Sequence, residues 1–112
     1  MSLAALFVIG CSVHPEQPLL ERFFAASRLR DRTALQALST IIFEPREDGI
    51  VTNFKIAGVT EEQASGDTVT KNATITAPVK LSDGQIVQKT LVVTLERRAD
   101  VWIVTGVAAF QR

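Results

Sequence analysis

Few side chains in this sequence could carry out covalent or acid–base chemistry. The 112 residues include one cysteine, Cys11, one histidine, His14, and no tyrosine. Nucleophilic catalysis needs a nucleophile within hydrogen-bond reach of a base, but these two residues lie in a polar, proline-containing stretch that is typical of a linker. Most carboxylates fall at expected turns and strand ends, which disfavours paired acids. We therefore expect no catalytic residues, no metal site and no cofactor.

The overall charge also limits the classes of partner. Twelve Lys and Arg residues balance twelve Asp and Glu residues, so the formal net charge is zero. Nucleic-acid-binding domains normally carry a basic patch or stripe, and none is visible here. Apolar residues make up 46% of the chain and charged residues 21%, which is typical of one globular domain. We expect no nucleic-acid partner.

The uncharged N-terminal run ends at the cysteine. Residues 3–10 are apolar or small, and eight helical residues rise only about 12 Å, which is too short to cross a ~30 Å hydrocarbon core. Such a run has the length of the apolar region of a secretory signal. Residues 8–11 read Val-Ile-Gly-Cys, which resembles the lipobox of bacterial lipoproteins.

The lipobox resemblance implies where in the cell the protein is located. Residues 1–10 would be a signal peptide, Cys11 would carry the lipid that anchors the chain to a membrane, and residues 11–17 would form a tether. Several acyl chains together give a firm anchor. The implied location is the cell envelope. Ser12 differs from the aspartate that marks inner-membrane retention in some bacteria, which favours the outer membrane, facing the periplasm. The alternative is that residues 3–9 form a strand or helix of the fold, with Cys11 buried.

Residues 18–112 show a change of periodicity from helix to strand. Apolar spacing of 3.6 predicts a helix over 18–29, and Asp31 can cap a second short helix. Alternation with a period of two then predicts antiparallel strands, with a polar loop or irregular edge at 58–66. The expected strands are 50–56, 68–80, 86–96 and 101–110. The predicted fold class is α+β, with N-terminal helices packed on a curved antiparallel sheet.

The order of these elements resembles a known family. An aromatic-rich first helix, an aspartate before a short second helix, and a late Trp102 followed by alternating aliphatic residues are similar to the nuclear-transport-factor-two-like, or cystatin-like, roll. The resemblance covers about residues 18–112 and is one of pattern. It implies a cone between helices and sheet. Enzymes of the family, such as ketosteroid isomerase and limonene epoxide hydrolase, place acidic groups and tyrosine there, and this sequence has no tyrosine.

Two interpretations are open for the aromatic residues. Phe23, Phe24, Phe54 and Trp102 could line a pocket for a small apolar ligand in the cone. Alternatively they fill the core, which we favour because protein interiors are close-packed.

The last strand is apolar on both faces, which usually means that both faces are covered. Strict alternation places Ile103 and Val107 together on the outer face, and we expect an interaction surface there, for a homodimer or for an envelope protein partner. The alternative is a curled sheet that covers itself. The preferred function is therefore a membrane-anchored protein-interaction or self-association module. A carrier of an apolar ligand comes second, and an isomerase or hydrolase is least expected.

Overall fold

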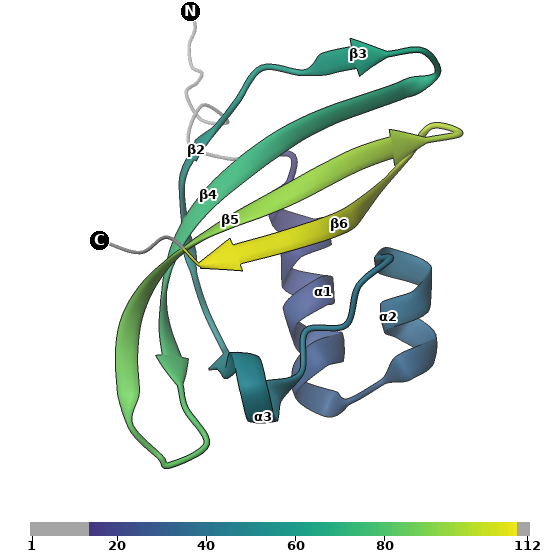
Figure 1. The fold of residues 1–112 in the computed structure, drawn as a ribbon. Helices are drawn as coiled ribbons and strands as arrows, with labels where there is room; N and C mark the ends of the chain where they lie inside the picture. Colours follow the sequence, from purple (N-terminus) through teal and green to yellow (C-terminus); the bar gives the residue numbers. More distant parts are fainter. Residues whose placement is uncertain (1–13, 110–112) are drawn as a thin grey trace, which may run out of the picture.

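A computed structural model of the chain describes residues 14–109, which form an α+β domain (Figure 1). Within these residues the elements are α1 (Gln17–Leu29), α2 (Arg32–Leu38), α3 (Pro45–Asp48), β1 (Ile50–Val51), β2 (Lys55–Val59), β3 (Gln63–Ser65), β4 (Thr68–Lys80), β5 (Ile86–Arg98) and β6 (Val101–Ala109). The helices come first in the chain and pack on one side of a strongly curled antiparallel sheet. The fold class predicted from the sequence is confirmed.

The ends of the first two helices are set by Pro18, Arg30 and Asp31. Pro18 lies in the first turn of α1, where its missing N–H costs nothing. Arg30 ends α1 with a left-handed backbone (φ 55°), and its N–H donates to the Ser27 carbonyl (3.1 Å). The Asp31 side chain then accepts from the Ala34 N–H (3.1 Å), which confirms the predicted cap of α2.

A third helix, α3, turns the chain into the sheet. The Glu44 N–H donates to the Asp48 carboxylate (2.8 Å), which closes this single turn. Gly49 follows with φ 94°, and a Cβ there would collide with the Val79 side chain. The sequence did not predict this helix, because four residues are too few to show a helical period.

Two long strands form the middle of the sheet. β4 and β5 are each 13 residues long and pair from Val69↔Arg97 to Lys80↔Ile86. The other edge of β4 pairs in succession with β3, β2 and β1, and β6 follows β5 at the end of the sheet. The strand predicted over 50–56 is therefore divided between β1 and β2, and the predicted loop at 58–66 contains the end of β2 and all of β3.

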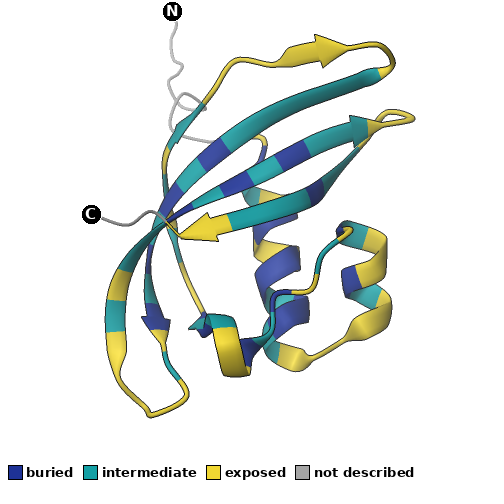
Figure 2. Cartoon of the chain, in the orientation of Figure 1, coloured by how far each residue is buried: buried dark blue, intermediate teal, exposed yellow. Residues whose placement is uncertain are grey.

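The core lies between α1 and the inner face of the sheet (Figure 2). Every second residue of β4 from Ala73 to Val79 is buried, as the predicted alternation requires. Leu91, Val93 and Leu95 of β5 lie in the same layer. In the first strand region Val51 is buried, whereas Ile50 is half-buried and Thr52 is exposed.

A bulge in β6 changes which residues face outward. Leu95 pairs with Val104, but Thr94 pairs with Gly106, so Thr105 is an extra residue in the ladder. Beyond this point the alternation is shifted by one residue. Val107 pairs with the buried Val93 and packs against the core. The expectation that Val107 shares the outer face with Ile103 is therefore wrong.

Candidate functional site

The aromatic residues predicted to line a pocket are divided between two places. Phe23 and Phe24 are buried, with ring centroids 5.0 Å apart, and Phe43 lies 5.4 Å from Phe24. The Phe54 ring is 5.7 Å from Phe24, so these residues fill the space beneath α1. Phe24 and Phe54 also border a surface hollow of about 350 Å³ between α1 and the segment before β2. Trp102 lies apart from this group, at the rim of the core.

The Trp102 ring instead belongs to a charged cluster. The Lys71 Nζ lies 4.2 Å from the centroid of the Trp102 ring and 2.5 Å from the Glu16 Oε2. The Arg97 guanidinium is 5.8 Å from the same ring. The side chains of Glu16 and Lys71 are only 7% and 10% exposed, so this ion pair is almost wholly removed from water. It ties the residue that precedes α1 to the inner face of β4.

The charge state of Glu16 follows from this environment. Burial raises the pKa of the carboxyl, but the hydrogen bond from Lys71, the Glu16 backbone and the positive charges of Lys71 and His14 lower it more. The pKa of Glu16 is therefore below its ordinary value. Its second oxygen, Oε1, is buried without a hydrogen-bond partner among the described residues. Acid catalysis would need the opposite, a raised carboxyl pKa.

The sequence analysis missed this pair. Glu16 was expected to lie in the solvated tether, and Lys71 was given no role. A signal was nevertheless present, because Lys71 falls between Val69 and Ala73 on the core-facing side of the alternating pattern. A charge at a core-facing position requires a partner, and the sequence alone could not identify Glu16 as that partner across 55 positions.

The outer edge of β6 is the second candidate site. None of the nine residues of β6 is charged, and Val101 at its start is 56% exposed. Among residues 14–109, the backbone partner of this edge is the segment after α2, where Ser39 bridges Val104 and the Thr40 N–H donates to the Val104 carbonyl (2.9 Å). Ala108 and Ala109 at the far end are exposed. Natural edge strands are commonly protected by charges or proline, and β6 has neither.

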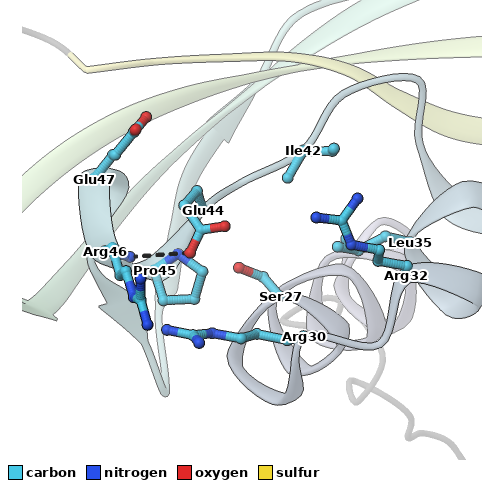
Figure 3. Close-up of a pocket in the computed structure, with 9 residues that line it drawn as sticks. All are labelled: Ser27, Arg30, Arg32, Leu35, Ile42, Glu44, Pro45, Arg46 and Glu47. Atoms are coloured by element: carbon cyan, nitrogen blue, oxygen red, sulfur yellow. Dashed lines mark hydrogen bonds between the residues drawn. The ribbon is translucent and has the colours of Figure 1, made fainter.

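A groove lined by basic residues is the third candidate site. A hollow of about 380 Å³ lies between the end of α1, α2 and α3 (Figure 3). A second hollow of about 820 Å³ lies between α3 and the β4–β5 turn, and Arg30 and Arg46 line both. We name these two neighbouring hollows, which share Arg30, Pro45 and Arg46, the arginine groove. Its basic side chains are Arg30, Arg32, Arg46 and Lys80, and its carboxylates are Glu44, Glu47 and Asp83.

Two kinds of feature are absent from the described residues. Across residues 14–109, no helix is long and apolar enough to span a membrane. In the same range, no three His, Cys, Asp or Glu side chains are grouped so that they could hold a metal ion. Residues 8–11 and the predicted lipidation site Cys11 lie outside the described part of the chain. Comparison with known protein families, with curated proteins and with solved structures found no match to this chain.

Proposed function

We propose that this protein is a lipoprotein of the cell envelope whose domain associates with a second copy through the edge of β6. The single observation that carries the association is an uncharged nine-residue edge strand, with an exposed end at Ala108 and Ala109. The lipid would sit on Cys11, as the lipobox resemblance implies. The similarity to the nuclear-transport-factor-two-like roll remains a prediction and adds nothing to this argument.

The proposed anchor lies close in the sequence to the start of the described domain. Four residues separate Cys11 from Glu16, so the two are at most about 18 Å apart when the chain is fully extended. Glu16 is held on β4 by Lys71. A lipid on Cys11 would therefore keep the start of α1 close to the membrane surface, and the domain would have a preferred orientation there.

An edge strand offers a physical basis for self-association. Its outward N–H and C=O groups form a ready template for another strand, and two copies related by a two-fold axis can pair the same strands in antiparallel fashion. Ser39 bridges Val104, and residues 105–109 come after this bridge in β6. Among the described strands, none pairs with the outer edge of residues 105–109. A second β6 would satisfy these groups and cover the small apolar side chains.

The packing beneath α1 supports association over carriage of an apolar ligand. Phe23, Phe24 and Phe43 occupy the space that such a ligand would need. The lowered pKa of Glu16 likewise argues against isomerase-type acid catalysis.

The test of association is a charge placed on the edge. Ala108 is exposed, so Ala108→Lys should fold normally but oppose strand pairing. Gln63→Lys on β3, at the other edge of the sheet, is the matched control. Sedimentation equilibrium should give a dimer for the parent chain and for Gln63→Lys, and a monomer for Ala108→Lys. A parent chain that stays monomeric at high concentration would remove the proposal.

A further inference from the structure

We propose that the arginine groove binds a small anionic ligand through its phosphate groups. Arg30 and Arg46 are the centre of the site, since each of them lines both hollows. Arg32 extends the basic lining into the first hollow, and Lys80 extends it into the second. The ligand would thus meet positive charge at each end and in the middle of the groove.

The basic side chains of the groove have no partners in the described part of the chain. The two ion pairs among residues 14–109 are Glu16–Lys71 and Glu96–Arg98, and neither lies in the groove. Figure 3 shows the side chains of Arg30 and Arg46 directed toward the same part of the hollow. Two guanidinium groups repel one another unless an anion lies near both. This arrangement favours an anionic occupant.

The carboxylates of the groove have other roles. Glu44 accepts from the Arg46 N–H (3.3 Å) and thereby caps α3. Asp83 accepts from the Gln85 N–H (2.9 Å) in the β4–β5 turn. Glu47 lines the first hollow together with Arg30, Arg32 and Arg46. Glu44 and Asp83 therefore hold the local backbone, whereas Arg30, Arg32 and Arg46 form no ion pair among residues 14–109.

The backbone at Arg30 is a second, independent observation. Its φ of 55° is a conformation that glycine adopts most easily at the end of a helix. An L-residue with a Cβ is strained there, and such strain is often retained at functional sites. The arginine contributes its side chain to the lining of both hollows, which glycine could not do.

The ligand chemistry follows from the guanidinium group. Its planar fork donates two parallel hydrogen bonds to the oxygens of a phosphate, and such charge-assisted bonds are roughly twice as strong as neutral ones. Several cations along one groove suit a ligand with more than one phosphate group. The first hollow has a volume of about 380 Å³, which is within the usual range for small-ligand sites.

A phosphate group could come from a soluble ester or from a lipid headgroup. The groove lies at the C-terminal end of α1, whereas Glu16 lies at its N-terminal end, and 13 helical residues separate them by about 20 Å. On a chain anchored at Cys11 the groove would face away from the membrane that holds it. This step rests on the proposed function, and it favours a soluble ligand.

The test is titration of the full chain with inorganic pyrophosphate, followed by calorimetry at about 0.15 M salt. We expect saturable binding that Arg30→Gln and Arg46→Gln each weaken about tenfold. Arg22→Gln, on the exposed side of α1 outside the groove, is the matched control and should bind like the parent. Arg30→Gly keeps a favourable backbone at that position, so its loss of binding could not be attributed to unfolding.

A second experiment distinguishes a soluble phosphate ester from a lipid headgroup. Vesicles of phosphatidylcholine with and without phosphatidylglycerol are sedimented with the same proteins. Capture by the anionic vesicles that fails in the Arg30 and Arg46 variants, without pyrophosphate binding, would support the groove and identify a lipid headgroup. Absence of both kinds of binding, or an equal loss in Arg22→Gln, would overturn the proposal. Neither arm involves the edge of β6, so the groove and the dimer can fail separately.

Discussion

The buried ion pair between Glu16 and Lys71 yields the sharpest prediction. Its atoms are 2.5 Å apart, and at an effective dielectric constant of about 20 the attraction is on the order of 6 to 7 kcal/mol. Much of this attraction offsets the cost of removing two nearly buried charges from water. Glu16→Gln keeps the shape but leaves the Lys71 charge without its counterion. We expect the free energy of unfolding to fall by about 3 kcal/mol at neutral pH.

Urea unfolding followed by far-ultraviolet circular dichroism measures this loss. With an m-value of about 1.5 kcal/mol per M, the midpoint should fall by about 2 M. Glu62→Gln, in the exposed segment before β3, should leave the midpoint within about 0.3 M of the parent. Trp102 is the sole tryptophan and the chain has no tyrosine, so its fluorescence reports separately on the contact with Lys71.

The dependence of the free energy of unfolding on pH is a second measure of the Glu16–Lys71 ion pair. Because the pKa of Glu16 is lowered on folding, the unfolded chain takes up this proton first as the pH falls. The contribution of the pair is therefore complete above the ordinary pKa of 4.5 and is lost as the pH falls through the lower value of the folded state. The difference in free energy of unfolding between the parent and Glu16→Gln should therefore become smaller as the pH falls from 4.5 through the lower pKa of the folded state. Equal midpoints for Glu16→Gln and Glu62→Gln at neutral pH would refute this account.

Three further predictions concern other parts of the molecule. Gly49→Ala should lower the free energy of unfolding by about 2 to 3 kcal/mol in thermal melts, because its Cβ collides with Val79 and its φ is 94°. Arg30→Gly should raise it by about 0.5 to 1 kcal/mol, since φ is 55° there, so that a variant without pyrophosphate binding melts higher than the parent. Intact mass of the protein from native membranes should show loss of residues 1–10 and a lipid on Cys11, both absent in Cys11→Ser; an unmodified, full-length native protein would contradict the anchor.

The sequence predicted those features that depend on local patterns. The buried face of β4 follows from alternation between small polar and aliphatic residues, and the start of α2 follows from the capping chemistry of Asp31. Both patterns are set by near neighbours in the chain. The division of the strand over 50–56 was not predictable in this way, because each half pairs with a different segment of β4.

The errors at the candidate sites come from contacts between distant residues. Val107 faces the core because one extra residue, Thr105, is accommodated opposite β5, and alternation within β6 alone contains no sign of the shift. Glu16 has the polarity of a linker residue, and its burial depends on Lys71. The arginine groove joins residues from α1, α3 and the end of β4, which no single segment brings together.

The proposed anchor at Cys11 would place the Glu16–Lys71 pair and the arginine groove at different distances from the membrane. The Glu16–Lys71 pair fixes the start of α1 on the sheet, and only four residues separate Glu16 from Cys11. The proposed anchor would therefore hold this end of α1 within about 18 Å of the lipidated residue. The arginine groove, about 20 Å away along α1, would then point from the membrane into the surrounding compartment, where a soluble ligand can reach it.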